Sequence, residues 1–240
     1  IIRRHLRFPD GVRLMDHPVT YRGGVCQLFQ RAETSAYFGR EVALQYVHAH
    51  LRYAEAMAGL GDAQEVWWAL QMANPIGLTG RLPSAAPRQS NVYFSSSDGD
   101  CRDRHEAARR FDELRGGTLP VKAGWRLYSS GPGIYLHKVR SVLLGIRERY
   151  DDIHIDPMLP TTLLPCIVQA RHEGRAITLS LEEADRPGVL INGKKVPFTP
   201  ANYPYRTGGM VLNRRVYQSR LGESNNHIRI CVARTNSLAG

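Results

Sequence analysis

Four polar side chains in the stretch GREVALQYVHAHLRYAEAMAGLGD could act together on a ligand. Glu41, Gln45, His48 and Arg52 follow one another at intervals of about one helical turn, so in a helix they would share one face. A carboxylate, an amide, an imidazole and a guanidinium together offer hydrogen-bond donors and acceptors. This set could therefore line a polar cavity.

The element that would position these side chains is one helix from Gly39 to Asp62, ended by Gly59 and Gly61. Most of its remaining surface is apolar or small, which is typical of a buried helix. Buried polar groups must be satisfied, either by one another and their neighbours or by a cavity and its contents. The pattern leaves a structural alternative open, in which the stripe is an ion-pair network and His48 is a core histidine.

Further helices are expected. The first runs from Ala63 to Ala73 with Asp62 as its N-cap, and NPIG at 74–77 ends it. A short turn between this helix and the preceding one predicts an αα-hairpin. The second runs from about Ile134 to Ile146 and follows the SSGPG loop at 129–133.

The character of the chain changes near residue 150. Residues 78–117 are predicted to be irregular, apart from a short strand in NVYFSSSDGD at 91–100 that runs into a loop and a short helix from Arg104 to Leu114. Residues 150–240 instead alternate apolar and polar residues and carry turn signals. HEGR at 172–175 and Asn-Gly at 192–193 predict hairpin turns. The sequence therefore predicts a helical domain followed by an antiparallel β domain such as a sandwich.

Composition narrows the class of protein. The 240 residues carry a net charge of +10 with a pI near 9.8, but the arginines are spread along the whole chain. Without a basic run or a nucleic-acid motif, nucleic-acid binding is not expected. The sequence has no apolar run of about 18 residues, so it predicts no transmembrane helix, and no membrane partner is expected. A cytoplasmic location is the expectation.

The cysteines and the first residue add two expectations. Cys26, Cys101, Cys166 and Cys231 are widely spaced and form no CxxC pair, so neither a zinc site nor a disulfide framework is predicted. The chain begins with Ile1 rather than Met and has no signal-peptide pattern, which suggests a fragment of a longer chain.

Several segments resemble glycoside hydrolase family 94, which contains inverting β-glucoside phosphorylases and the phosphorylase-like domain of cyclic β-1,2-glucan synthases. Residues 40–63 are similar to its Arg-Glu-x-x-x-Gln-Tyr-x-His-Ala stretch. GWRLYSSGPGIYL at 124–136 and LLGIRERYDDIHIDPMLP at 143–160 follow in the family's order, and NPI at 74–76 closes the hairpin. HAHLRYAEA and YFSSSDGD resemble the 1,2-β-oligoglucan phosphorylase branch.

The resemblance implies an α+β multidomain fold. Residues 1–150 would be the C-terminal portion of an (α/α)6 barrel catalytic domain, and residues 151–240 a C-terminal antiparallel β-sandwich domain. It also implies an inverting phosphorolysis of β-1,2-linked oligoglucans. Inorganic phosphate would attack the anomeric carbon and yield α-glucose 1-phosphate and a shortened chain, with no cofactor.

The resemblance also implies a phosphate site. His48 would be a phosphate ligand by its position in the family motif, with Ser129, Ser130 and Gly131 as loop ligands. This suits the chemistry, because phosphate is already anionic and needs donors and positive charge rather than a second carboxylate. A helix start after small residues also favours an anion.

The sugar-binding residues follow from the same motif. Glu41 and Gln45 are assigned to the glucose hydroxyls next to the cleaved bond. Arg40 or Arg52 would orient Glu41 or help to hold the anion. Each of these residues has a structural alternative as support for its neighbours.

The catalytic acid is not expected in this sequence. The family places an aspartic acid well upstream, and here only Asp10 and Asp16 precede the helix, in unrelated contexts. The general acid is therefore expected upstream of Ile1, and the fragment alone should be inactive. Whether the full-length protein forms a homodimer stays open.

Two other groups of residues invite alternative interpretations. Asp98, Asp100 and Asp103 could suggest calcium, but they lack the EF-hand pattern, so a substrate loop or turn caps are preferred and no metal site is predicted. Trp67 and Trp68 could stack on sugars, but packing is the more frequent role of tryptophan on a helix.

Other functions remain open from the sequence. The family also contains phosphorylases for cellobiose and other β-glucans, as well as synthase domains. A non-catalytic glycan-binding helical domain is the alternative from another class.

Overall fold

The structure, a computed structural model, describes residues 1–17, 45–87, 96–123, 130–172 and 174–233. The chain divides into two compact units, here called the first unit (Ile1–Ala56 and Trp68–Lys138) and the second unit (Met57–Trp67 and Val139–Gly240). The predicted domain boundary at residue 150 stays a prediction, and the compact units divide elsewhere.

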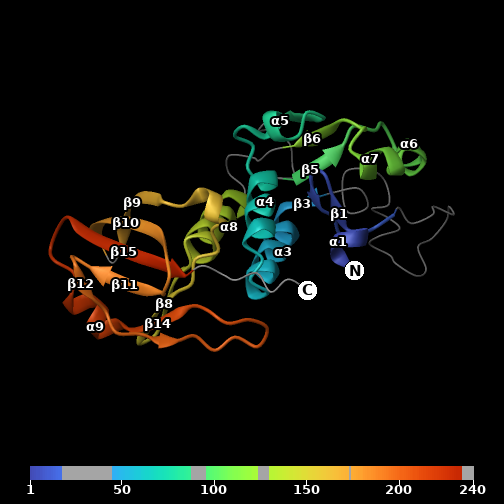
Figure 1. The fold of residues 1–240 in the computed structure, drawn as a ribbon. Coiled ribbons are helices and arrows are strands. Elements are labelled where there is room, and N and C mark those ends of the chain that lie inside the picture. The colour runs from blue at the N-terminus through green and yellow to red at the C-terminus, as the bar shows by residue number, and fades with distance from the viewer. Residues whose placement is uncertain (18–44, 88–95, 124–129, 173, 234–240) are drawn as a thin grey trace. The chain divides into compact units, whose positions relative to one another are not determined.

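The first unit combines short strands and helices (Figure 1). Its core gathers Phe8, Phe111, Leu114, Leu119 and Val121. The elements in chain order, two of which continue into the second unit, are α1 (Ile2–His5), β1 (Arg7–Phe8), β2 (Gly11–Val12), β3 (Gln45–Tyr46), α3 (Val47–Gly59), α4 (Ala63–Ala73), α5 (Leu78–Arg81), β4 (Ala85–Pro87), β5 (Ser96–Gly99), α6 (Arg104–Arg109), α7 (Phe111–Gly116), β6 (Val121–Ala123) and α8 (Ser130–Lys138).

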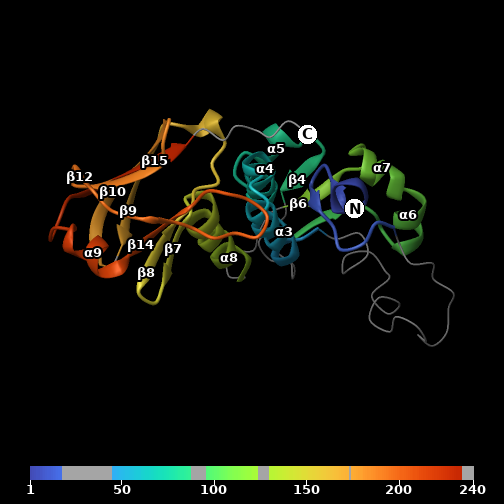
Figure 2. The same ribbon diagram turned by 60° about the horizontal axis from the view of Figure 1, so that its bottom comes forward.

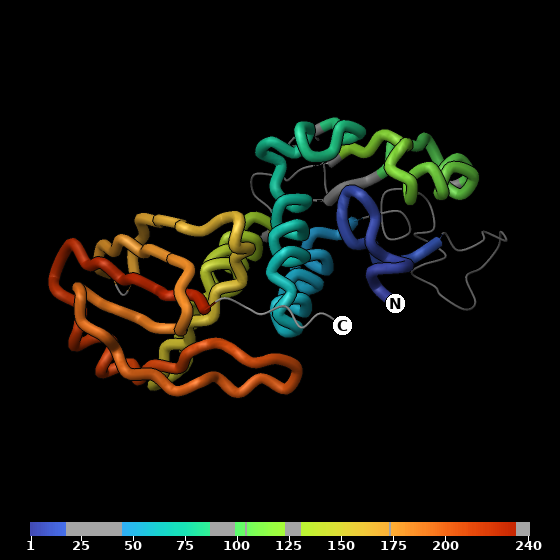
Figure 3. The backbone as a smooth tube through the Cα atoms, viewed as in Figure 1, coloured from blue at the N-terminus to red at the C-terminus, as the bar shows by residue number. Residues whose placement is uncertain are grey.

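The hairpin of α3 and α4 agrees with the sequence (Figure 3). The main chain turns at Gly61, and Asp62 Oδ1 accepts a hydrogen bond of 2.9 Å from the backbone N–H of Glu65 as the predicted N-cap. Val66 and Leu70 are fully buried on the predicted apolar face. Local signals therefore determine this hairpin.

The expectations for residues 78–146 are confirmed in part and corrected in part. The predicted short strand and short helix are present as β5 and as α6 with α7, but the segment 78–117 also contains α5 and β4 and is less irregular than expected. The third helix begins at Ser130 rather than Ile134, because Pro132 falls in the first turn, where its missing N–H breaks no helical bond. That helix ends in a π-helical turn, Val139–Leu143, and Ile146 starts a strand.

The second unit is rich in β-structure (Figure 2). One sheet has the order β12-β11-β15-β10-β9 and another the order β13-β14-β8-β7. The elements are β7 (Ile146–Arg149), β8 (Asp152–Ile155), a 3-10 turn (Thr161–Leu163), β9 (Cys166–His172), β10 (Arg175–Ala184), β11 (Gly188–Ile191), β12 (Lys194–Lys195), β13 (Thr199–Pro200), β14 (Met210–Asn213), α9 (Arg214–Ser219) and β15 (Asn226–Ala233).

Both predicted hairpin turns of the second unit are confirmed. His172 pairs with Arg175 across the first, and Asn192 and Gly193 have φ of 50° and 79° in the second. The expectation of a purely antiparallel domain is wrong, because β15 pairs parallel with β10. The long connection between these strands permits the crossover that parallel pairing needs, and alternation of residues does not encode strand order.

The (α/α)6 barrel stays a prediction, since the described elements of the first unit are a helical hairpin, short helices, the two-stranded sheet of β1 and β2 and the mixed sheet β3-β5-β6-β4. None of the helices in the described ranges has the length and hydropathy to cross a lipid bilayer. Cys166 and Cys231 are free thiols.

Candidate functional site

The segment from Gln45 to Arg52 carries three of the predicted ligand residues. Arg40, Glu41 and Ser129 lie outside the described residues, so the structure does not test their assignments.

Gln45 lies on a strand rather than on the predicted helix. Gln45 pairs with Ser97 and Tyr46 with Ser96, so both residues lie on β3, which pairs antiparallel with β5. The predicted shared helical face of Gln45 and His48 is therefore wrong. Helical periodicity can run through a strand by coincidence, and Tyr46 has a good strand propensity.

Gln45 is nevertheless buried, with 2% of its surface exposed. Its side chain packs against Gly11 of β2 so closely that a Cβ at Gly11 would lie 2.6 Å from Gln45 Cγ. Gly11 has a φ of +136°, a conformation that side chains rarely adopt. The amide is thus fixed in the interior of the first unit.

His48 lies in the first turn of α3 and is half-buried. Its ring stacks on that of Tyr46, with centroids 4.9 Å apart and an interplanar angle of 19°. Burial lowers the pKa of His48 below its ordinary value, because the imidazolium loses hydration. Near pH 7 the ring is therefore neutral, with one N–H donor, and an anion beside it would favour the charged form.

His50, two residues further on, was missed by the sequence analysis. It is fully buried; its Nδ1 accepts the backbone N–H of Val12 at 3.0 Å, and its Nε2 lies 2.7 Å from the carbonyl oxygen of Ala69. An accepting Nδ1 requires the proton on Nε2, which donates to Ala69. In HAHL either histidine could have been the structural one, and only the contacts distinguish them.

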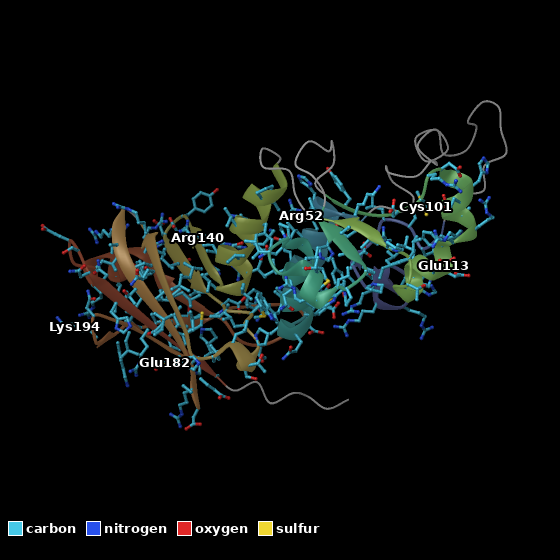
Figure 4. The ribbon with its side chains drawn as sticks, turned by 90° about the horizontal axis from the view of Figure 1, so that it is seen from above. Arg52, Cys101, Glu113, Arg140, Glu182 and Lys194 are labelled. Carbon is cyan, nitrogen blue, oxygen red and sulfur yellow. The ribbon has the colours of Figure 1, made fainter. Side chains whose placement is uncertain are left out.

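Arg52 is exposed on α3 and is labelled in Figure 4. Its Nη1 lies 2.8 Å from Glu55 Oε2, while Lys138 Nζ lies 2.9 Å from the other oxygen of Glu55. Burial raises the pKa of Glu55, but the hydrogen bonds and charges of Lys138 and Arg52 outweigh this and lower it. Arg52 thus takes part in an ion-pair network with Glu55 and Lys138. The network that the structural alternative placed along the stripe includes Glu41, which lies outside the described residues.

The loop ligands fall at the start of α8. Ser130 is its first residue, with a side chain outside the described part, and Gly131 is buried in the first turn. Tyr135 Oη accepts a hydrogen bond of 3.3 Å from Asn74 Nδ2, and Lys138 reaches Glu55. These two contacts link α8 to α4 and α3 within the first unit.

The alternative groups of residues have structural roles where they are described. Asp103 Oδ1 caps α6 through the backbone N–H groups of His105 and Glu106, which confirms the turn-cap interpretation for this residue. Asp100 pairs with Lys122 at 2.9 Å. The guanidinium carbon of Arg7 lies 3.6 Å from the ring centroid of Trp68, which agrees with a packing role for Trp68.

The comparisons with known proteins bear on this chain as a whole. No family model matches it. It is 48% identical over 217 residues, 90% of the chain, to 1,2-β-oligoglucan phosphorylase of Listeria innocua, and this match covers 20% of that protein. It is 25% identical over 152 residues, 63% of the chain, to the cyclic β-(1,2)-glucan synthase NdvB of Rhizobium meliloti, 5% of whose length is covered.

The chain therefore spans about a fifth or less of the length of these curated relatives. At 48% identity over nine-tenths of its own length, the chain is confirmed as a relative of the glycoside hydrolase family 94 phosphorylases, the 1,2-β-oligoglucan phosphorylase among them.

Proposed function

We propose that this chain acts within a longer inverting glycoside phosphorylase that cleaves β-1,2-linked oligoglucans with inorganic phosphate. The observation that carries this proposal is the 48% identity to a 1,2-β-oligoglucan phosphorylase over 90% of the chain. The proposed product is α-glucose 1-phosphate, and phosphate is a co-substrate, with no cofactor. A phosphate oxygen attacks C1 while the glycosidic C–O bond breaks and its oxygen takes a proton from the general acid.

The proposed architecture follows the same relationship. The hairpin of α3 and α4 would belong to an (α/α)6 barrel completed by other parts of the protein. Residues 151–240 would be the C-terminal β-sandwich domain, after a catalytic portion in 1–150. Cytoplasmic location and a homodimer of the full-length protein stay predictions.

His48 is the proposed phosphate ligand. It lies in the first turn of the 13-residue helix α3, where the positive end of the helix dipole favours an anion. Its neutral ring offers one donor, and a phosphate beside it would favour protonation. Ser129, Ser130 and Gly131 at the start of α8 are proposed to complete the phosphate site.

Gln45, Glu41, Arg40 and Arg52 are the proposed sugar-side residues. The amide of Gln45 is buried and packs against Gly11, so its position is fixed. The general acid is proposed to come from outside this sequence. Asp10 is already paired with Arg13 at 2.5 Å, and Asp16 lies 2.6 Å from His17 Nδ1.

The test is phosphorolysis by the full-length protein. Incubated with β-1,2-glucan oligosaccharides and phosphate, it should release glucose 1-phosphate in proportion to phosphate. Product from cellobiose or another β-glucan instead would favour those family members. Glycan binding without any product would favour the non-catalytic alternative.

His48→Ala tests the phosphate assignment. Loss of one charge-assisted hydrogen bond should raise the KM for phosphate about ten- to hundredfold. His137→Ala, an exposed histidine of α8, is the matched control and should leave it unchanged. An unchanged phosphate KM in His48→Ala would remove His48 from the site.

A further inference from the structure

The hairpin of β1 and β2 contacts the Gln45–Arg52 segment at two points. Gly11 supports Gln45 at a distance that leaves no room for a Cβ. The next residue, Val12, donates its backbone N–H to His50 Nδ1 at 3.0 Å. The hairpin therefore contacts side chains on both sides of His48.

The hydrogen bond between Val12 and His50 is itself fixed by a second hydrogen bond of the same imidazole ring. Because His50 Nδ1 accepts from Val12, its Nε2–H donates to Ala69 of α4. The imidazole thus connects β2, α3 and α4 through one buried ring. A shift of the hairpin would disturb the first turn of α3, which carries His48.

A buried ion pair closes the turn of this hairpin. Arg13 Nη2 lies 2.5 Å from Asp10 Oδ2, and their side chains are 0% and 3% exposed. The guanidinium of Arg13 lies 5.0 Å from the ring centroid of Phe8, and that of Arg115 lies 4.7 Å from it. The backbone N–H of Arg13 also donates to Leu6 at 2.8 Å.

Stability alone is a poor explanation for this pair. Nε and Nη1 of Arg13 are buried and find no hydrogen-bond partner within the described ranges. Buried donors without acceptors oppose folding, and apolar residues often replace buried ion pairs without loss of stability. The pair does, however, bridge the two ends of one short segment, in which Gly11 and Val12 of β2 lie between Asp10 and Arg13.

We propose that Asp10 and Arg13 are positioning residues, which hold Gln45 and His48 in the geometry that binds the glucan and phosphate. The inference rests on the proposed function. The pair acts through Gly11 on Gln45 and through Val12 and His50 on the first turn of α3. Neither residue of the pair touches the reacting atoms.

The test uses the full-length protein with the double substitution Asp10→Leu/Arg13→Met, which replaces the pair by apolar side chains. The KM for both substrates should rise about tenfold, with a smaller change in kcat and a thermal midpoint close to that of the parent protein. Hydrogen exchange of peptides covering residues 45–53 should become faster. Glu182→Gln/Arg229→Gln, which removes an exposed pair 3.7 Å apart, is the control and should change none of these quantities.

Two further measurements keep the test decisive. If the double variant does not fold, Arg13→Lys should keep both KM values closer to the parent protein than Arg13→Met does, since it retains the charge opposite Asp10. If the parent protein shows no phosphorolysis, the proposed function fails and hydrogen exchange alone decides the positioning role. Unchanged exchange in residues 45–53, or unchanged KM values in an active and folded variant, would overturn the proposal.

Discussion

Asp10 in the first unit and Asp156 in the second are both buried, with 3% and 4% of their surfaces exposed, but their surroundings differ. Asp10 pairs with Arg13 three residues away, inside one hairpin. Asp156 forms hydrogen bonds and ion pairs with side chains from distant parts of the sequence. The comparison sets an ion pair within one short segment beside a carboxylate whose hydrogen-bond partners come from several elements.

The contacts of Asp156 are extensive. Its Oδ2 accepts from Arg147 at 2.9 Å, from Tyr203 Oη at 2.9 Å and from Arg206 at 2.5 Å, and Oδ1 accepts from Arg206 at 3.1 Å. Arg206 Nε also donates to the carbonyl of Ala58 in the last turn of α3. Within the second unit, this carboxylate therefore connects the β13–β14 loop, β7 and the tip of the helical hairpin.

Substitution of Asp156 should have the largest effect on stability. In Asp156→Asn the amide places an NH2 group against arginine donors, because both carboxylate oxygens are engaged. Breaking such a buried pair should lower the free energy of unfolding by about 3–5 kcal/mol. Calorimetry of the full-length protein measures it, with Glu182→Gln as control. A loss below about 1 kcal/mol would contradict the difference drawn between the two aspartates.

A helix cap in the same unit should have a smaller effect. Asn213 Oδ1 accepts the backbone N–H groups of Arg215 and Val216 at 3.0 and 3.2 Å, which caps α9. Asn213→Ala should cost about 1 kcal/mol, and Asn213→Asp should restore most of it. A loss as large as that of Asp156→Asn would show that the second unit is sensitive to any polar contact rather than to Asp156.

The pH dependence should be the smallest effect, and it compares one histidine from each unit. Burial lowers the pKa of His48, and burial with the charges of Arg149 and Arg147 lowers that of His154. As pH falls through about 6.5, the unfolded state takes up protons before the folded state does, so stability decreases.

Thermal unfolding between pH 7.5 and 5.5 checks this expectation. His48→Asn and His154→Asn should each flatten the decline relative to the parent protein. If stability declines in both variants as steeply as in the parent protein, groups other than these two histidines cause the acid sensitivity.

Local structure was predictable where a signal lies within a few residues. The Asp62 cap and the Asn192–Gly193 turn form as expected, because a short side chain or a positive φ acts on its immediate neighbours. The helix start was not predictable, because the partner of Gln45 is Ser97, far along the chain. Helical periodicity cannot reveal such a strand pairing.

The site was predictable in part. The motif identified the segment with Gln45, His48 and Arg52, but contacts with β2 and α4 make His50 structural. Arg13 carried no signal in the sequence, since an arginine is usually exposed unless it is paired.

The sequence by itself determined the relationship to β-glucan phosphorylases, the helical hairpin and the β-hairpin turns, because motif order and turn chemistry are written in neighbouring residues. Only the tertiary structure decided which histidine is buried as a connector, that Gln45 lies on a strand, and that β15 runs parallel to β10. The physical reason is that burial and pairing depend on partners such as Val12 for His50 and Arg206 for Asp156, 38 and 50 residues away.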